Sequence, residues 1–555
     1  MRAYFLLIVT VVLCHFGTAH AQTWQWASKA GGIDNDNCNG IDVDALGNSY
    51  ITGTFRDSTS FGNTLLLSAG GVSVYIAKYD VNGQFVWARI AAHGPTISVG
   101  GICIDPIGNI SIIGAFSDTA ILGTSPPLSL TSSGSYDVYV ARYSGNGDVV
   151  WARSIGDTGI DYAGGISRDS IGNVYMVGDF HITPYPYSSS KIVVAKFDIA
   201  GNNVWLRKEI NNGFSHFGNG IKTDSKGNSY VIGNYFNTIK FTNSDSIVAG
   251  NVESNIFVAK FDASGAFMWG QTAGAGSGYC VSRAIDIDTD GNSYITGQYH
   301  GTISFGSLSI SGTSGVGTDV CIAKCDANGS FVWVNRSIGI GTPSNVCLDI
   351  SGKVLVSGYF NQPIRFGSFS LSCAGDNDVF IAELNESGEF VWATSCGGLH
   401  NDYVTGAAVA SPHGIYLAGS FSDTIHFGDA LSLLDTSTVK SDIFIAKLNT
   451  VTSVEEHSES VSSTIHPNPS SGRFTIVLPT DDATITVTDA LGRLVLMTRA
   501  TQKETALHVE SNGVYMVTVA TMQRLTTQMV TVEPQSTFGH TFRNDALLLL
   551  HVIRH

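Results

Sequence analysis

One turn in the sequence carries three carboxylates at a spacing that suits a metal ion. Asp286, Asp288 and Asp290 form a D-x-D-x-D-G run with Gly291. Calcium takes about six to eight oxygen ligands, and loops of this kind end on an acidic residue at the twelfth position. Gly297 stands at that position here. Because Asp and Asn also cap ordinary turns, we interpret the run as a solvated hairpin turn, and the question of calcium binding stays open.

Common catalytic signatures are absent from the sequence. It contains no nucleophile elbow, H-E-x-x-H, P-loop or dinucleotide fingerprint. The histidines are scattered, and we expect His413 and His426 on loops. We therefore predict no catalytic, cofactor-binding or metal-ligating residue and no enzymatic activity. The alternative is a secreted hydrolase or lyase on the same scaffold, because an active site can assemble residues that are distant in sequence.

The composition excludes several classes of partner. The net charge of -16 disfavours nucleic acid, because phosphate binding needs a basic face. It equally disfavours electrostatic docking on an anionic membrane. The hydrophobic content of 43% and the 28 Phe and 20 Tyr residues provide material for a large core. The chain is therefore predicted to fold rather than to be disordered.

The first residues have the pattern of a signal peptide, which we assign to 1–21. Arg2 supplies the positive charge, an apolar run extends from Phe5 to Phe16, and Ala19-His20-Ala21 fits a cleavage site. The run is shorter than the roughly 20 residues that span a bilayer. We predict export and no transmembrane segment.

Cysteine usage gives no disulfide or zinc pattern. Cys321 and Cys325 lie on one predicted strand, about 13 Å apart at ~3.3 Å per residue, too far to bridge each other. Other repeats place aromatic residues there, so buried free thiols are expected. Eight cysteines follow the signal peptide: Cys38, Cys103, Cys280, Cys321, Cys325, Cys347, Cys373 and Cys396.

An internal repeat determines the predicted fold. Seven tryptophans recur at intervals of 54 to 64 residues, and two phrases alternate between them. IDVDALGNSYITGTF (from Ile41) and VYIAKYDVNGQFVWA (from Val74) are examples. Each has alternating apolar residues around a Gly turn, which predicts a β-hairpin. The recurring tryptophans are Trp26, Trp87, Trp151, Trp205, Trp269, Trp333 and Trp392.

Two hairpins per unit predict a four-stranded sheet that cannot bury a core alone. Packing such sheets around an axis predicts an all-β, seven-bladed β-propeller over residues 22–449. The last unit stops near Asn449 without its tryptophan strand. We therefore expect Thr23–Ala27 to pair beside Ile443–Leu448 and close the ring.

The repeat phrases D-x-x-G-N-x-Y-x-x-G and F-I-A-K-x-D-x-x-G-x-x-x-W resemble the bacterial β-propeller repeats called SBBP repeats, over about residues 23–450. That resemblance implies the fold and little about activity. The D-x-x-G-N turns should ring one face, and the longer connections, such as 60–71 and 183–190, should gather as loops on the other. Because binding usually resides on variable loops, we expect the loop face to bind an extracellular polysaccharide or protein.

A second module follows a polar linker, 450–464. Residues 465–533 alternate as short strands and predict a small β-sandwich. The matching motifs closely resemble the type A sorting domain of the type IX secretion system, which implies the type IX machinery as a partner and a secreted or surface-attached location. The residues that carry the match include Pro467, Asn468, Pro469, Gly472, Gly492, Arg493, Gly513 and Tyr515. Sorting domains usually end soon after their final strand, so residues 534–555 are an atypical tail that we expect to be disordered.

Overall fold

The computed structural model describes most of the chain. The described residues are 22–182, 189–210, 214–244, 246–248, 254–313, 315, 317–349, 351–410, 414–435, 440–450, 464–466, 473–478, 483–489, 494–509, 511, 513–520 and 525–532. Every regular element among them is a β-strand. Residues 1–453 form one compact unit and residues 454–555 another. The predicted signal peptide, most of the predicted linker and the predicted tail lie outside the described residues.

The first unit consists of consecutive antiparallel sheets, each with two hairpins in chain order. The tryptophan phrase forms the third and fourth strands of each sheet, and the D-x-x-G-N phrase forms the first and second. The sheets are β2 (Asn37–Val43), β3 (Ser49–Phe61), β4 (Thr64–Tyr79) and β5 (Phe85–Gly94); β7 (Gly101–Ile104), β8 (Ile110–Ser117), β11 (Asp137–Tyr143) and β12 (Val149–Ile155); β13 (Asp161–Arg168), β14 (Val174–Ile182), β15 (Ser189–Phe197) and β16 (Asn203–Lys208); β17 (Phe217–Thr223), β18 (Ser229–Tyr235), β21 (Asn255–Phe261) and β22 (Phe267–Ser277); β23 (Cys280–Ile287), β24 (Ser293–Tyr299), β27 (Asp319–Cys325) and β28 (Phe331–Ile338); β29 (Thr342–Leu348), β30 (Val354–Phe360), β33 (Asp378–Leu384) and β34 (Phe390–Cys396).

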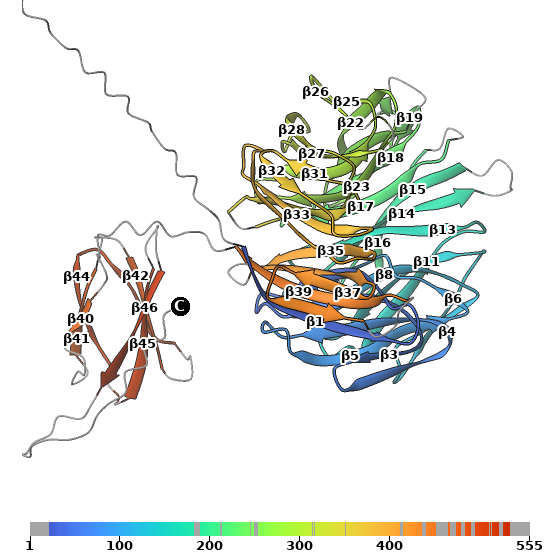
Figure 1. Ribbon diagram of the computed structural model, residues 1–555. Helices are drawn as coiled ribbons and strands as arrows, with labels where there is room; N and C mark the ends of the chain where they lie inside the picture. Colours follow the sequence, from blue (N-terminus) through green and yellow to red (C-terminus); the bar gives the residue numbers. More distant parts are fainter. Residues whose placement is uncertain are drawn as a thin grey trace, which may run out of the picture. The chain divides into compact units, whose positions relative to one another are not determined.

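The N-terminal strand completes the last of these sheets. β35 (Asp402–Ala410), β36 (Gly414–Phe421) and β39 (Asp442–Thr450) pair in that order, and β1 (Gln22–Gly32) pairs antiparallel with β39. The register runs from Trp24 opposite Leu448 to Ala30 opposite Ile443. Figure 1 shows β1 and β39 side by side, although they come from opposite ends of the unit.

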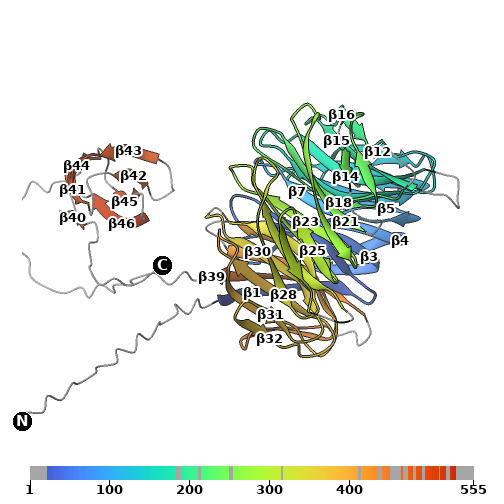
Figure 2. The same ribbon diagram turned by 90° about the horizontal axis from the view of Figure 1, so that it is seen from above.

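The first strands of successive sheets pack against each other around an axis. β2 contacts β7, and the contacts continue through β13, β17, β23 and β29 to β35, which contacts β2 again. In Figure 2 the sheets fan out from this centre. The unit is therefore all-β and propeller-like.

The D-x-x-G-N turns close by side-chain capping, as their sequence suggests. Asp44 Oδ1 accepts the backbone N–H groups of Leu46 (3.0 Å) and Asn48 (2.9 Å). Gly47 has a φ of 79°, which glycine adopts without strain. Corresponding aspartates cap the turns that begin at Asp105, Asp169, Asp224, Asp288 and Asp349.

The recurring tryptophans join each sheet to the next. Trp205 Nε1 donates to the Ala263 carbonyl at 3.1 Å, in the turn between the third and fourth strands of the following sheet. Gly265 in that turn has a φ of 80°, and a Cβ there would stand 2.7 Å from the Trp205 indole. Glycine is thus required for both conformation and close approach. The same contact is made by Trp26 with Val81, Trp151 with Ile199, Trp269 with Ala327 and Trp333 with Glu386.

The expectation that the longer connections are loops was wrong for several of them. In the connection 60–71, β3 continues to Phe61 and β4 begins at Thr64, so the segment is a hairpin that turns at Gly62 (φ 56°). Leu66 is buried, whereas Leu65 and Leu67 on either side are exposed; this is the alternation of a strand. Residues 183–188 lie outside the described part.

Equivalent hairpins recur and extend the outer edge of the preceding sheet. β25 (Thr302–Phe305) pairs with β22, and β31 (Ile364–Phe366) pairs with β28. Their partners are β26 (Leu308–Ser311) and β32 (Phe369–Leu371). His426, expected on a loop, lies in the equivalent strand β37 (Thr424–Phe427), which pairs with β38 (Leu431–Leu434). His413 lies outside the described residues.

The second unit has two sheets that share one core. β40 (Thr464–His466), β41 (Arg473–Val477) and β44 (Glu504–His508) form one sheet. β42 (Ala483–Asp489), β43 (Leu494–Ala500), β45 (Gly513–Ala520) and β46 (Leu525–Val532) form the other. Phe474 and Ile476 from the first sheet pack in one cluster with Val487 and Val517 from the second.

Candidate functional site

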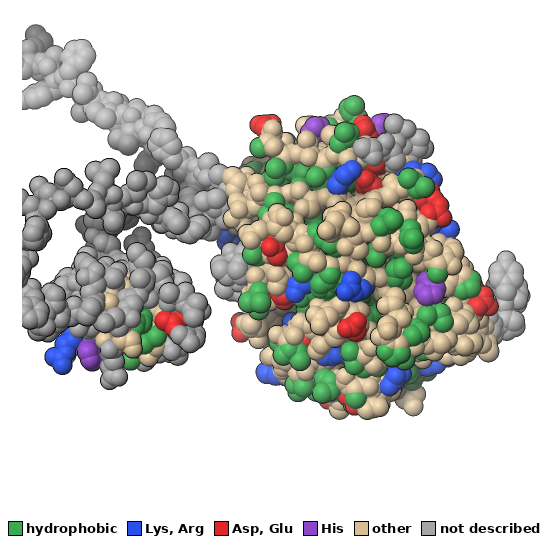
Figure 3. Space-filling model, turned by 90° about the horizontal axis from the view of Figure 1, so that it is seen from below, with side chains coloured by type: hydrophobic (Ala, Val, Ile, Leu, Met, Phe, Trp, Pro, Cys, Tyr) green, Lys and Arg blue, Asp and Glu red, His purple; other side chains and the backbone are tan. Residues whose placement is uncertain are grey.

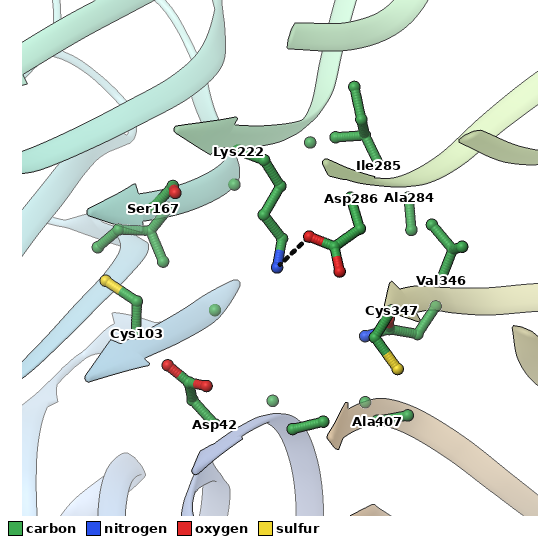
Figure 4. Close-up of a pocket in the computed structure, with 18 of the residues that line it drawn as sticks. Asp42, Cys103, Ser167, Lys222, Ala284, Ile285, Asp286, Val346, Cys347 and Ala407 are labelled. Carbon is green, nitrogen blue, oxygen red and sulfur yellow. Dashed lines mark ion pairs between the residues drawn. The ribbon is translucent and has the colours of Figure 1, made fainter. Parts of the chain in front are cut away.

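A cavity of about 530 Å³ lies on the axis of the first unit. Its walls are the first strands of the sheets, and the close-up in Figure 4 shows their side chains around the opening. We call the residues at one equivalent register position the axial ring. They are Asp42, Cys103, Ser167, Lys222, Asp286, Cys347 and Ala408.

The axial ring holds an ion pair. Lys222 Nζ lies 3.3 Å from Asp286 Oδ1, and Figure 4 shows the two side chains reaching across adjacent strands. The Asp286 charge raises the pKa of the Lys222 ammonium. Asp42 Oδ2 accepts the backbone N–H of Ile104 at 2.8 Å, and burial raises the pKa of its carboxyl group. Lys222 is therefore held protonated and is a poor nucleophile or base.

The two thiols of the axial ring are also unreactive. Burial, with a further contribution from Asp42, raises the pKa of Cys103 to about 12. Burial likewise raises the pKa of Cys347. Since the thiolate is the nucleophile of cysteine chemistry, neither side chain is activated. The eight described cysteines are all free, and all but the half-buried Cys373 are buried; Cys321 and Cys325 are thus buried free thiols, as predicted.

The structure separates the three carboxylates of the D-x-D-x-D-G run. Asp286 faces the axial cavity, and its Oδ2 accepts the backbone N–H of Leu348 at 2.9 Å. Asp288 caps its own turn through the N–H groups of Asp290 (3.1 Å) and Asn292 (2.8 Å). Asp290 is exposed. Among the described residues, no group of three or more His, Cys, Asp and Glu side chains is placed to hold a metal ion.

A polar pocket of about 420 Å³ lies where two of the sheets meet. We call it the Asn pocket; it is lined by Asn361, Gly375, Asp376, Asn377 and Asn401. These residues occupy the connections that precede β31, β33 and β35. No sequence pattern indicates this pocket, because its lining comes from three separate connections.

Hydrogen bonds fix the amides of the Asn pocket to a tyrosine that lies beside it. Asn377 Nδ2 donates to Asn401 Oδ1 (2.6 Å) and to the Tyr403 hydroxyl (3.1 Å). The Tyr403 hydroxyl donates to Asn401 Oδ1 (3.0 Å). The Tyr403 ring packs edge-to-face on Tyr359, with centroids 4.9 Å apart. These bonds occupy Asn377 Nδ2 and Asn401 Oδ1 and leave Asn377 Oδ1 as an acceptor and Asn401 Nδ2 as a donor for a ligand.

Two of the predicted sorting residues are described in the second unit. Gly513 begins β45 opposite Val532, and Tyr515 is buried, its hydroxyl donating to the Ser511 carbonyl at 2.8 Å. These contacts place both residues in the structural frame of the unit. Pro467, Asn468, Pro469, Gly472, Gly492 and Arg493 lie outside the described residues.

The face drawn in Figure 3 carries no concentration of one kind of side chain. Hydrophobic groups, cations and carboxylates are interspersed on the first unit. No helix among the described residues is long and apolar enough to span a bilayer.

Comparison with known proteins identifies both modules. A family model described as a secretion system C-terminal sorting domain matches residues 464–533. The chain carries a type IX sorting domain. A second model, described as a beta-propeller repeat of the SBBP kind, matches residues 25–54. The two predicted resemblances are confirmed, and the sorting domain marks export by the type IX system to the cell surface or extracellular space.

Curated and solved relatives are distant. An uncharacterized WD repeat-containing protein of Acanthamoeba polyphaga mimivirus is 23% identical over 72% of this chain, which spans 36% of that relative's length. PorZ, a surface component of the type IX system of Porphyromonas gingivalis, aligns with 91% of this chain and 75% of its own at 14% identity and a TM-score of 0.29. Chaetomium thermophilum Sqt1 aligns with 76% of this chain and 97% of its own at 8% identity and 0.38. These structural scores are too low to support an argument about function.

Proposed function

We propose that the chain is a seven-bladed β-propeller with a C-terminal β-sandwich, and that outside the cell it binds a glycan without catalysing a reaction. The pairing of β1 with β39 and the contact of β35 with β2 support a closed ring of seven sheets. The packing of two sheets on one cluster supports the sandwich. The sorting domain supports display at the surface or release.

The observation that carries the ligand class is the Asn pocket. Its volume of about 420 Å³ lies in the usual range for a small-molecule site, about 300–1,000 Å³. Asn side chains present a donor and an acceptor in one plane, which suits the neighbouring hydroxyl groups of a sugar. The Tyr359 and Tyr403 rings lie next to the amides and offer an apolar surface for the C–H face of a pyranose.

The lack of an activated lysine or thiol in the axial cavity supports binding rather than catalysis there. In the axial cavity Lys222 is held protonated by Asp286, and the thiols of Cys103 and Cys347 have raised pKa values. General-acid or nucleophilic catalysis needs a group whose pKa is tuned to the working pH. A hydrolase or lyase would have to use another site, and detection of sugar cleavage would overturn the proposal.

A glycan and polysaccharide array tests the proposal. The chain beginning at Gln22 should bind one sugar class saturably, and Asn377→Ala should weaken that binding about three- to tenfold, the value of one or two hydrogen bonds. The control is Asn328→Ala, an exposed asparagine in the turn between β27 and β28. No binding to any sugar, or equal weakening by both substitutions, would contradict it, and binding of a protein ligand alone would reassign the ligand class.

A further inference from the structure

Pairs of buried aspartates meet at three junctions between adjacent sheets. In each pair one aspartate begins the third strand of a sheet, and the other lies at the start of the first strand of the next sheet. Every member has an exposed fraction of 3% or less. We call them the interface carboxylate pairs: Asp137 with Asp161, Asp378 with Asp402, and Asp442 with Asp36.

The two carboxylates of a pair approach each other across a glycine. A Cβ on Gly156 would overlap Asp137 Oδ1 and would stand 2.7 Å from Asp161 Oδ2. At the other two junctions, consecutive glycines take this place. Gly397 lies against Asp378. A Cβ on the next residue, Gly398, would be 3.6 Å from Asp402 Oδ2. The absence of side chains at these glycines leaves room beside each carboxylate.

Several of these oxygens make no hydrogen bond of standard geometry in the described part of the chain. The carboxylate oxygens of Asp36 and of Asp402 are buried and make no hydrogen bond of standard geometry, although the Gly32 N–H and the Thr59 hydroxyl lie beside Asp36, and the Gly398 and Ser422 N–H groups lie beside Asp402. Oδ1 of Asp137, Asp378 and Asp442 likewise makes no such bond. A buried carboxylate that lacks both well-formed hydrogen bonds and a cation is strongly unfavourable, so the pairs are incomplete as they stand.

Other junctions of the same unit show how the chain neutralises this position itself. His216 precedes β17 as Asp36 precedes β2, and its Nδ1 lies 2.5 Å from Glu209 Oε1. Asp319 begins β27 as Asp378 begins β33, and Arg336 Nη1 lies 3.7 Å from its Oδ2. Both junctions match each carboxylate with a cationic or protonatable side chain.

The interface carboxylate pairs have almost no such cation. Lys29 Nζ lies 3.6 Å from Asp442 Oδ2. Among the described residues, no Lys, Arg or His forms an ion pair with any other member. The missing positive charge must therefore come from outside the chain, as a proton or a metal ion.

The surrounding oxygens favour a hard metal ion. The Ser58 carbonyl oxygen lies against Gly32 together with Asp36 Oδ2, and the Thr424 carbonyl oxygen lies against Gly398 together with Asp402 Oδ2. Carboxylate and main-chain carbonyl oxygens are the ligands that calcium takes, and extracellular modules bind it in the roughly 10⁻⁴–10⁻³ M range. The export shown by the sorting domain places the chain where calcium is available.

We propose that each interface carboxylate pair binds one calcium ion, which joins two adjacent sheets. Each pair supplies two carboxylates, and main-chain oxygens and water complete the coordination. At these three junctions the ion neutralises the buried carboxylates, as Arg336 does for Asp319 and His216 for Glu209 at two other junctions.

Metal analysis and thermal unfolding of the full chain from Gln22 test the proposal. Protein equilibrated with calcium chloride and freed of excess ion should retain one calcium per pair, and calcium should raise the Tm relative to chelator. Asp402→Asn and Asp36→Asn should each lose one bound ion and part of the Tm increase. The control is Asp290→Asn, which removes an exposed carboxylate of the D-x-D-x-D-G turn and should leave both readouts unchanged.

The alternative, a shared proton, gives opposite results. It predicts no retained calcium and a Tm that does not depend on calcium. Either of these would overturn the proposal, as would loss of calcium in Asp290→Asn alone. If Asp402→Asn does not fold, Asp137→Asn gives the same count at another junction.

Discussion

At the scale of the residue, one glycine in the repeat both adopts a positive φ and allows a tryptophan ring to approach the backbone closely. Gly265 has a φ of 80° and lies against the Trp205 indole. Gly70 has a φ of 103° but nothing within 4 Å of a Cβ position. Comparing the two positions therefore separates backbone strain from steric overlap.

Gly265→Ala should lower the free energy of unfolding by about 2–4 kcal/mol, since about 1–2 kcal/mol of strain adds to overpacking. Gly70→Ala should cost only the strain. Urea denaturation measures both values. Equal losses would show that the tryptophan contact contributes nothing to the requirement for glycine.

The buried aspartates predict a pH dependence with a definite sign. Burial, with Asp378 and Asp423 nearby, raises the pKa of Asp402 from 3.8 to about 8. Burial likewise raises that of Asp36, which faces Asp442 and Asp34, to about 7. Because the folded pKa exceeds the unfolded value, their contribution is complete below about pH 4 and is lost as the pH rises through about 7 to 8.

In chelator, the Tm should therefore fall between about pH 5 and about pH 8. Calcium should reduce this fall, because the ion competes with protons for the same oxygens. Differential scanning calorimetry at several pH values measures the effect. A Tm that rises with pH in chelator would contradict it.

At the scale of the element, β1 is the strand that joins the two ends of the first unit. It covers the edge of β39 and places Trp26 Nε1 3.2 Å from the Val81 carbonyl. Deleting residues 22–32 should expose an unpaired edge and give an aggregating or unfolded protein. Addition of a peptide with the sequence of residues 22–32 should restore cooperative unfolding by circular dichroism. A truncated protein with an unchanged Tm would show that β1 is dispensable.

The sorting module predicts a localisation experiment. Deletion of 464–533 should retain the chain in the periplasm of a host with type IX secretion, because the sorting domain directs passage across the outer membrane. Deletion of 534–555 is the control, since the family match ends at residue 533, and it should leave export unchanged. Fractionation and immunoblotting read out both variants. Surface display without 464–533 would contradict the assignment.

Much of the fold was predictable because the repeat expresses local rules. The D-x-x-G-N phrase encodes a capped turn, and the spacing of Trp205 and Trp269 matches the joining of successive sheets. The hairpin that turns at Gly62 contradicts the loop predicted over 60–71, because its alternation of apolar and polar residues is too short to stand out. Local pattern alone did not reveal that this segment pairs with the preceding sheet.

The candidate site was much less predictable. In the sequence Asp286 belongs to the D-x-D-x-D-G run, whereas in the structure it forms an ion pair with Lys222 on another sheet. The Asn pocket brings Asn377 and Asn401 together from different connections. Sequence spacing cannot reveal such contacts, because they depend on how the sheets pack.

At the scale of the whole molecule, the chain combines an export module with a propeller-like unit whose sheets pack around an axis. The charged residues of the axial ring are held in contacts of their own, Lys222 with Asp286 and Asp42 with the Ile104 N–H. The Asn pocket lies instead at the junction of two sheets. The central claim is that this junction, held on a rigid ring, binds a glycan.

Isothermal titration of the array-selected sugar into the wild-type chain and the Asn377→Ala/Asn401→Ala variant tests that claim most directly. The account predicts saturable binding to the wild type and a loss of about tenfold or more in the variant, with unchanged Tm in both. Equal affinity for the two proteins would contradict it, because the sugar would then bind elsewhere on the molecule.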